Sequence, residues 1–148
     1  MPSLLQKLKD NFRRPGDVLT FLATGRRLMA AHRCKTRLPV GELLVRFSPA
    51  PGPPCEPGFI EALERYVNWW LARRWFPVPH NCWTRSLVLF WLLRTHGVGD
   101  VELRVGLDAG SGDLRGHAWL VRSGEPFLDR SGEDLTRYRV LLRHPPTD

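Results

Sequence analysis

The stretch from Cys82 to about His96 constrains the fold more than any other part of the chain, because it is apolar around most of a helix. Its centre, Leu87 to Leu93, is an unbroken run of apolar residues. Asn81 before it is a good N-cap residue, and Gly97 after it is a typical helix stop. A helix that is apolar on several sides is normally buried on several sides. We therefore expect this segment to be the central helix of the protein.

The chain before this helix also has the hydrophobic period of helices. Residues 4–12, about 17–33, 38–47 and 57 to about 75 are predicted to be helical. The five prolines in the segment 48–57 predict an irregular loop. The side chains expected to face the interior are Val18, Leu19, Leu22, Leu28 and Met29 of the second helix, Leu43, Leu44 and Phe47 of the third, and Phe59, Ile60, Leu63, Val67, Trp70 and Leu71 of the fourth.

After Gly97 the hydrophobic pattern changes from the period of a helix to that of a strand. Apolar residues alternate with polar or small ones from Val101 to Leu107. Shorter strands are predicted over residues 117–121, 126–129 and 138–142, and a loop rich in Gly and Asp over 108–116. Helices followed by antiparallel strands indicate an α+β fold, in which the central helix packs on a small antiparallel sheet.

The length and charge of the chain predict one domain with two unlike parts. We expect a single domain over residues 1–148, with a basic helical part over 1–47 and a core over 57–148. Residues 1–46 hold ten Lys and Arg against three Asp and Glu, whereas residues 47–148 hold twelve of each. The net charge of +7 therefore lies in the N-terminal third. Such a region attracts nucleic acid, an anionic membrane or an acidic protein, or is only a solvated helix face.

The cysteine content and the N-terminus bear on the compartment of the protein. An odd set of three cysteines does not form a disulfide framework, and no Cys/His spacing typical of zinc is present. Lys7 and Lys9 interrupt the N-terminus before an apolar signal segment can form. The run Leu87–Leu93 is too short to cross a bilayer. We expect a cytoplasmic protein with no structural metal and no stable membrane insertion.

Cys82, His117 and Asp129 come in the order of a thiol nucleophile, its imidazole base and the carboxylate that orients the base. Cys82 directly follows Asn81, so its thiol is expected at the positive end of a helix dipole, which stabilises a thiolate. Its backbone N–H is an unpaired donor of the first helical turn and suits an oxyanion. Trp75 and Asn81 are nearby candidates for a second donor. If the three side chains converge, the chain is an acyl-transfer enzyme.

The turn between the second and third strands decides whether His117 and Asp129 share a face of the sheet. A three-residue loop over residues 122–124, with Gly124 in the left-handed position, pairs His117 directly with Asp129. A two-residue loop, Ser123-Gly124, shifts the register by one and places them on opposite faces. The position of the glycine favours the three-residue loop, but the sequence leaves both open.

Each member of this set also has an ordinary structural interpretation. Cys82 is compatible with a buried thiol, His117 with a strand histidine beside aromatic residues, and Asp129 with a cap of the turn that follows it. Cys34 and Cys55 lack comparable neighbours and are interpreted as structural or incidental. Spacing alone therefore leaves a catalytic and a structural interpretation open.

Four pieces of the sequence together resemble a known family. Cys82–Ser86 opens an apolar helix, Val105-Gly106 and His117–Trp119 follow on predicted strands, and Asp129 comes after them. This combination, over about residues 77–130, resembles the transglutaminase-like B2 leader peptidases of lasso-peptide biosynthesis. One departure is Trp83, where a smaller aliphatic residue is more usual. We expect this departure to alter packing rather than chemistry.

The resemblance implies a papain-like fold, a triad of Cys82, His117 and Asp129, and no cofactor. It implies a cysteine peptidase that removes the leader from a ribosomally made precursor peptide through a thioester acyl-enzyme. It also implies a separate leader-recognition protein, called B1, as a partner, with the macrolactam cyclase as a further candidate. Supporting roles in substrate binding or structure are expected for Arg85, Trp119 and Asn81.

Two other functions are compatible with the sequence. The same type of Cys-His-Asp site performs amide transfer in transglutaminases and arylamine N-acetyltransferases, so the acceptor stays open. A non-catalytic basic binding protein is the second alternative. The sequence has no nucleic-acid motif, and its basic residues do not interleave with exposed aromatic residues. We therefore expect a peptide rather than a nucleic acid as the ligand.

Overall fold

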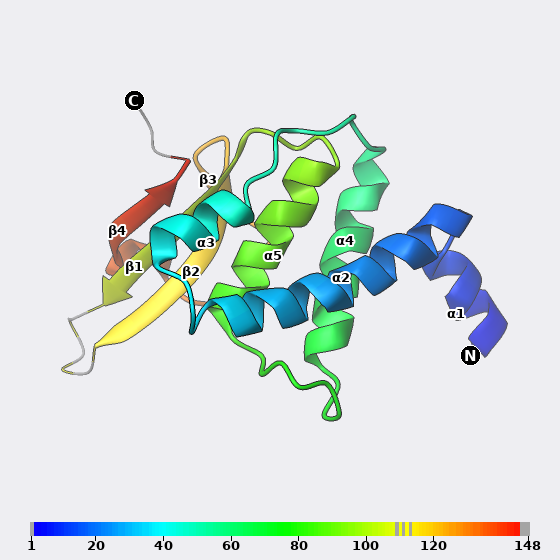
Figure 1. The fold of residues 1–148 in the computed structure, drawn as a ribbon, viewed down its shortest axis with the longest axis horizontal. Coiled ribbons are helices and arrows are strands. Elements are labelled where there is room, and N and C mark those ends of the chain that lie inside the picture. Colours follow the sequence, from blue (N-terminus) through cyan, green and yellow to red (C-terminus); the bar gives the residue numbers. More distant parts are fainter. Residues whose placement is uncertain (1, 109, 111, 113, 146–148) are drawn as a thin grey trace.

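The computed structural model describes residues 2–108, 110, 112 and 114–145. The elements are α1 Leu4–Asn11, α2 Pro15–Cys34, α3 Val40–Arg46, α4 Pro57–Leu71, α5 Cys82–Thr95, β1 Val101–Asp108, β2 Arg115–Arg122, β3 Glu125–Phe127, the 3-10 helix η1 Leu135–Arg137 and β4 Arg139–His144. The strands form one antiparallel sheet in the order β3-β2-β1-β4, which confirms the predicted α+β class (Figure 1). None of the described helices is both long and apolar enough to cross a membrane.

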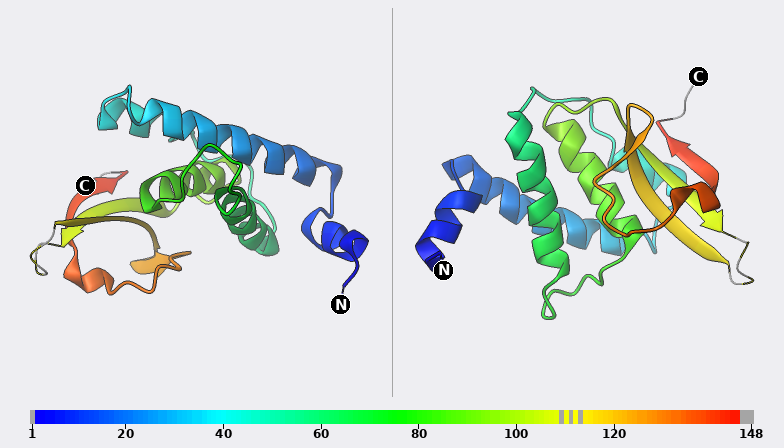
Figure 2. Two further views of the ribbon diagram at one scale, coloured as in Figure 1. Left: turned by 90° about the horizontal axis from the view of Figure 1, so that it is seen from below. Right: turned by 180° about the vertical axis from the view of Figure 1, so that it is seen from behind.

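The helix α5 is central, as the sequence predicts. The side-chain oxygen of Asn81 caps it by accepting a hydrogen bond from the backbone N–H of Thr84 at 2.8 Å. The run Leu87–Phe90 is fully buried, as is Leu93. The helices α2 and α4 pack on α5, and the strands β1 and β2 pack on it as well. Figures 1 and 2 show α5 between the other helices and the sheet.

The interior face of α2 differs from the predicted one. Val18, Leu19 and Leu22 are exposed, so their assignment to the core is wrong. A Cβ atom on Gly25 would lie 2.7 Å from the ring of Trp70 on α4, so the missing side chain lets these two helices approach closely. A stripe of small and polar residues carries little hydrophobic signal, which is why the sequence pattern misplaces the first half of the helix, whereas Leu28 is buried and Met29 half-buried as predicted. The buried residues of α2 are Asp17, Thr24, Gly25, Leu28 and Ala31.

The predicted interiors of α3 and α4 agree better with the structure. Leu43, Leu44 and Phe47 are buried, and the six positions predicted for α4 are buried or half-buried. The helix α4 ends four residues earlier than predicted. The chain then forms a turn, in which the backbone N–H of Phe76 donates a hydrogen bond to the carbonyl oxygen of Arg73 at 3.2 Å. The Phe76 side chain, at the end of this turn, is buried in the core.

The hairpin between β2 and β3 has a two-residue loop. Arg122 pairs with Glu125, so Ser123 and Gly124 alone form the loop, and the predicted three-residue loop is wrong. Their φ values are 54° and 79°, and two successive left-handed residues make the type I′ turn whose twist suits a hairpin. The third strand ends at Phe127, so Asp129 lies beyond the sheet rather than on it.

The other strands are longer than predicted. The loop between β1 and β2 is shorter than the predicted 108–116, because β1 runs to Asp108 and β2 begins at Arg115. Residues 109, 111 and 113 of that loop lie outside the described residues. The last strand, β4, extends to His144, two residues past its predicted end.

The two faces of the sheet carry separate groups of side chains. Leu103 and Leu120 belong to the core beneath α5. Side chains alternate along a strand, so Trp119 and Val121 project from the opposite face of β2, where they pack with Tyr138. Figure 2 shows the segment from β3 to η1 crossing β2 on this side. His117 lies on the same face as Trp119 and is therefore covered by that segment.

Candidate active site

The imidazole of His117 lies beside the carboxylate of Asp129. Nε2 of His117 is 3.6 Å from Oδ1 of Asp129. The two side chains are only 9% and 12% exposed, so water screens their interaction weakly. A carboxylate in this position orients an imidazole and stabilises its protonated form. The structure thus brings together two of the three residues of the predicted triad.

The turn at Leu128 produces this contact, and the strand register does not. The observed register, continued along the chain, would set Asp129 opposite Ala118 and on the other face from His117. Leu128 has a φ of 56°, a left-handed conformation that is uncommon for any residue with a Cβ atom. It ends the extended chain after β3 and turns Asp129 back toward His117. The contact expected from the sequence is present, but for a different structural reason.

Ser131 ties the two side chains together. Its Oγ donates a hydrogen bond to Oδ2 of Asp129 at 3.1 Å and lies 3.5 Å from Nε2 of His117. The backbone N–H of Ser131 donates to Oδ1 of Asp129 at 3.2 Å. These contacts fix the orientation of the carboxylate. Because Nε2 faces Asp129 and Ser131, Nδ1 is the ring nitrogen left for another partner.

Two aromatic rings hold the plane of the His117 ring. Trp119 stacks on it with ring centroids 5.7 Å apart and planes 15° apart, and Tyr138 lies 5.4 Å away. Gly106 is opposite His117 on β1. A Cβ atom on Gly106 would lie 3.1 Å from the Trp119 ring and 2.9 Å from the carbonyl oxygen of Arg139. Gly106 therefore leaves the space in which the aromatic wall of the site packs.

Cys82 is the first residue of α5, and its thiol is free and half-buried. The hydroxyl of Ser86, one turn further along, donates a hydrogen bond to the carbonyl oxygen of Ala118 at 3.1 Å. Residues four apart share one face of a helix, so Cys82 and Ser86 lie on the same side of α5. The short connection from α5 to β1 sets the C-terminal end of α5 at the start of β1. The N-terminal end of α5 therefore lies toward the part of β2 that carries His117.

Arg85, one turn after Cys82, forms a buried ion pair with Glu64 of α4. Its Nη2 lies 3.0 Å from Oε2 of Glu64, and its Nε donates a hydrogen bond to Oδ1 of Asn68 at 3.0 Å. Burial lowers the pKa of Arg85, whereas the carboxylates of Glu64 and Asp129 raise it. The guanidinium therefore braces α5 against α4 and places a positive charge near Asp129.

Glu64 is a site residue that the sequence analysis missed. Its carboxylate also holds Arg130, the neighbour of Asp129, with Nη2 3.1 Å from Oε1 and Nε 3.2 Å from Oε2. One buried carboxylate thus connects the helix that begins at Cys82 with the loop that carries Asp129. The sequence does carry a signal for it, because Glu64 is a charged residue within the apolar stripe of α4. A charge buried there requires a partner of opposite charge. Ser131 carried no such signal.

The predicted supporting residues have distinct places in the structure. Asn81 caps α5, Arg85 braces the helix, and Trp119 stacks on His117. Trp83 packs half-buried against the core, whereas Trp75 is 67% exposed. Within the residues that the structure describes, no group of three or more His, Cys, Asp or Glu side chains is arranged to hold a metal ion.

Comparison with known protein families places more than half of the chain in one superfamily. A family model described as "Transglutaminase-like superfamily" matches residues 54–143. The match begins after the basic N-terminal helices and includes Glu64, Cys82, His117 and Asp129. No curated protein and no solved structure matches the chain significantly.

Proposed function

Because the chain belongs to the transglutaminase-like superfamily, we propose that it is a cysteine peptidase whose catalytic residues are Cys82, His117 and Asp129. The position of His117 carries the proposal. Its ring lies against Asp129, and the carbonyl oxygen of the next residue, Ala118, accepts a hydrogen bond from Ser86, one turn into the helix that begins at Cys82. A thiol, an imidazole and a carboxylate in this order form acyl-enzyme intermediates on amide substrates.

In the first half of the proposed reaction, Nδ1 of His117 takes the proton of the Cys82 thiol. The sulfur attacks the carbonyl carbon, and the carbonyl electron pair moves to oxygen. The backbone N–H of Cys82, at the start of α5, donates a hydrogen bond to this oxyanion. When the intermediate collapses, the C–N bond breaks and protonated His117 gives its proton to the departing amine. Asp129 stabilises the imidazolium throughout.

In the second half, water hydrolyses the thioester. His117 takes a proton from the water as its oxygen attacks the acyl carbon. The C–S bond then breaks, and the thiolate of Cys82 regains a proton from His117. The products are a carboxylic acid and a free amine, and water is the only co-substrate.

The substrate that we propose is the junction between leader and core of a ribosomally made lasso-peptide precursor. The support is the resemblance of Cys82–Ser86 and His117–Trp119 to the corresponding segments of B2 leader peptidases. In this proposal a separate B1 protein recognises the leader, and the macrolactam cyclase uses the amine that the peptidase releases. The same site would perform amide transfer if an amine replaced water as the acceptor, which is the alternative reaction within the superfamily.

Mass spectrometry of the reaction products tests both reactions. The precursor and the B1 protein of the same source are incubated with wild-type enzyme, with Cys82→Ala and with the control variant Cys55→Ala. Wild type and Cys55→Ala should release a leader that ends in a free carboxylate, and Cys82→Ala should release none. A leader that carries an added amine, in reactions supplied with glycine ethyl ester, would indicate transfer instead. Cleavage by Cys82→Ala at the wild-type rate would overturn the proposal.

A further inference from the structure

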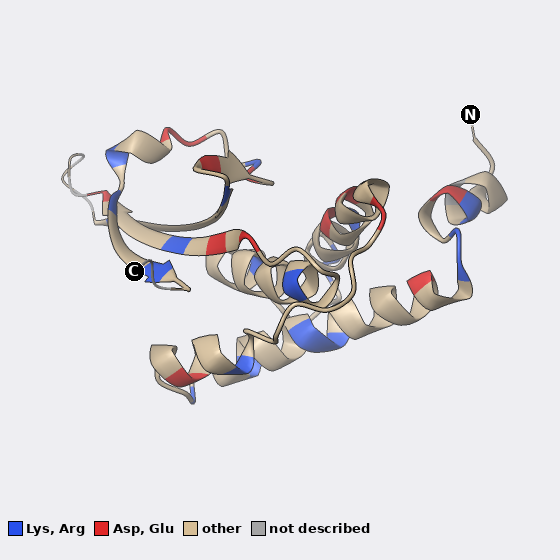
Figure 3. Ribbon diagram, turned by 90° about the horizontal axis from the view of Figure 1, so that it is seen from above, with Lys and Arg blue, Asp and Glu red and all other residues tan. Residues whose placement is uncertain are grey.

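A band of basic side chains follows α2, its connection to α3, and α3 itself. The segment 18–55 has six Lys and Arg residues but only one acidic residue, Glu42. Figure 3 shows basic positions along the middle and end of α2, with acidic positions only near its start and on α3. We use the name basic surface for the four exposed arginines of this band, Arg26, Arg33, Arg37 and Arg46.

The charges of the basic surface are not neutralised within the molecule. Among the described residues, none of its four arginines forms an ion pair with a carboxylate, although other exposed arginines such as Arg130 and Arg137 do. The cations are also crowded. The pKa of Arg27 is lowered by burial and further by the neighbouring charges of Arg46 and Arg26. A group of like charges without counter-charges attracts an anionic partner.

A hollow within this band offers space for an acidic side chain. Its volume is about 370 Å³, and it lies where α2 packs on α5. The guanidinium of Arg27 is held in place there, because its Cζ lies 4.2 Å from the centre of the Trp91 ring. A guanidinium whose position is fixed in this way, with only small side chains beside it, binds a carboxylate better than a mobile lysine on the surface does. The lining residues are Ala23, Arg26, Arg27, Ala30 and Trp91.

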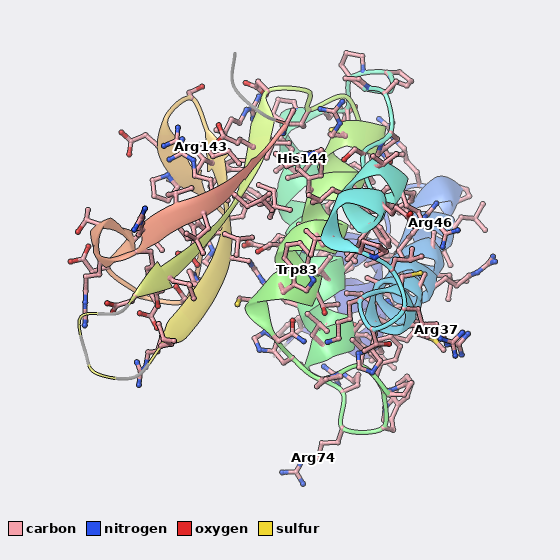
Figure 4. All side chains as sticks on the ribbon, turned by 60° about the vertical axis from the view of Figure 1, so that its left-hand side comes forward. Arg37, Arg46, Arg74, Trp83, Arg143 and His144 are labelled. Atoms are coloured by element: carbon pink, nitrogen blue, oxygen red, sulfur yellow. The ribbon has the colours of Figure 1, made fainter. Side chains whose placement is uncertain are left out.

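Two residues of the basic surface, Arg26 and Arg33, lie on α2, which packs on α5. Figure 4 shows Arg37 and Arg46 projecting outward on one side, with Trp83 between them and the sheet in this view. Trp83 is the residue that follows Cys82. Because α2 packs directly on α5, a chain bound along α2 is close to the helix that carries the thiol.

We infer that the basic surface binds an acidic segment of a peptide substrate, away from the bond that is cleaved. The inference rests on the proposed peptidase function, because the bound peptide must extend to Cys82. The surface suits a peptide better than a single-stranded nucleic acid, whose bases stack on exposed aromatic rings. The exposed tryptophans in the described part of the chain, Trp69 and Trp75, lie on or after α4, and the half-buried ring of Trp91 in the hollow is already covered by the Arg27 guanidinium.

A binding measurement with paired charge reversals tests the inference. The probe is a fluorescein-labelled decaglutamate peptide, and fluorescence anisotropy gives its Kd at low and at physiological salt. Arg37→Glu with Arg46→Glu should weaken binding by about tenfold or more and reduce its salt dependence. Arg26→Glu with Arg33→Glu, a separate pair on the same surface, should have a similar effect. The matched control, Arg139→Glu with Arg143→Glu, changes the same charge on exposed residues of β4 and should keep the Kd within about twofold.

Two outcomes would overturn the inference. Equal losses in the control and in the basic-surface variants would show that only net charge matters. Tighter binding of a single-stranded oligonucleotide of the same charge would point to nucleic acid. All proteins in the assay carry Cys82→Ala, so binding is measured without any catalysis. A failed cleavage assay with intact peptide binding would therefore count against the proposed function alone, and the reverse result against the basic surface alone.

Discussion

Nε2 of His117 lies 3.6 Å from Oδ1 of Asp129, although the register of the hairpin between β2 and β3 would place these two residues on opposite faces of the sheet. Their contact depends on Leu128, whose φ of 56° turns the chain out of the sheet. Arg130, the next residue after the carboxylate, is then anchored on Glu64. Asp129, the partner of the imidazole, is therefore positioned by a single turn and by the ion pair between the exposed Arg130 and the buried carboxylate of Glu64.

The turn at Leu128 makes the first prediction. Leu128→Ile should reduce kcat and destabilise the protein by about 1–2 kcal/mol, because a β-branched side chain is strongly disfavoured at positive φ. Leu128→Met conserves size without branching and should stay close to wild type. Urea unfolding and kinetics on the same preparations measure both effects. Equal behaviour of the two variants would show that the turn does not depend on this backbone conformation.

The shared carboxylate of Glu64 makes the second prediction. Glu64→Gln leaves the buried guanidinium of Arg85 without its counter-charge and should cost about 3–5 kcal/mol of unfolding free energy. It also frees Arg130, so activity should fall in the fraction that remains folded. The control is Glu61→Gln on the same helix, which is exposed and should change stability by less than about 0.5 kcal/mol. A loss in Glu64→Gln no larger than in the control would contradict the bracing role.

The helices and strands are largely predictable from the sequence, because their signals are local. The sequence predicts α5 to within one residue, since Asn81 marks its start and Gly97 follows its end. Leu43, Leu44 and Phe47 are likewise assigned correctly to the core. In each case a short segment contains both the apolar pattern and its boundary.

Two of the features that the sequence does not predict depend on residues far apart in the chain, and a third has no local signal. The buried side of α2 is defined by its close approach to Trp70, which no pattern within residues 15–34 contains. The left-handed conformation of Leu128 has no residue signal, because leucine is not typical there. The link from Glu64 to Arg130 joins α4 to a loop more than sixty residues later. Local propensity has no access to such contacts.

The wall of the site makes the third prediction. Gly106→Ala should destabilise the protein by about 1–3 kcal/mol, because the new methyl group would lie 2.9 Å from the carbonyl oxygen of Arg139 and 3.1 Å from the Trp119 ring. Gly116→Ala on the neighbouring strand is the matched control, since its Cβ would make only ordinary contacts at 3.8 Å or more. Thermal unfolding of both variants checks the difference. A similar Tm for the two would mean that the aromatic wall tolerates the added atom.

The pH dependence of stability makes the fourth prediction. Burial lowers the pKa of His144 from its ordinary value of 6.5, and the charge of Arg94 lowers it further. Nε2 of His144 lies 2.6 Å from the hydroxyl oxygen of Ser48. Because the pKa of the ring is lower in the folded chain, the unfolded chain binds a proton there more readily. The contribution of the His144 ring to the free energy of unfolding is fully present above pH 6.5. It is lost as the pH falls through the lower pKa that the ring has in the folded chain.

Replacing the ring should remove part of this dependence. In His144→Gln the free energy of unfolding should fall less steeply below pH 6.5 than in wild type. His96, whose pKa burial also lowers, contributes a slope of the same sign, so the double variant should be flatter still. Urea titrations across this pH range measure the slopes. An unchanged slope in His144→Gln would show that this ring does not titrate differently in the folded and unfolded chains.

The relative reactivity of the three cysteines tests the central claim most directly. Iodoacetamide labelling at neutral pH, followed by peptide mass spectrometry, gives the rate at each thiol of one molecule. Cys55 is the internal reference, because burial raises its pKa. Cys34→Ser is the background, because Nη1 of Arg46 lies 3.4 Å from the Cys34 sulfur and gives this thiol surroundings unlike those of the other two.

In this background, Cys82 at the start of α5 should react at least about tenfold faster than Cys55. The additional change His117→Ala should lower the Cys82 rate and leave the Cys55 rate unchanged. Equal rates at Cys82 and Cys55, or a Cys82 rate that does not depend on His117, would contradict the assignment of Cys82 and His117 as nucleophile and base.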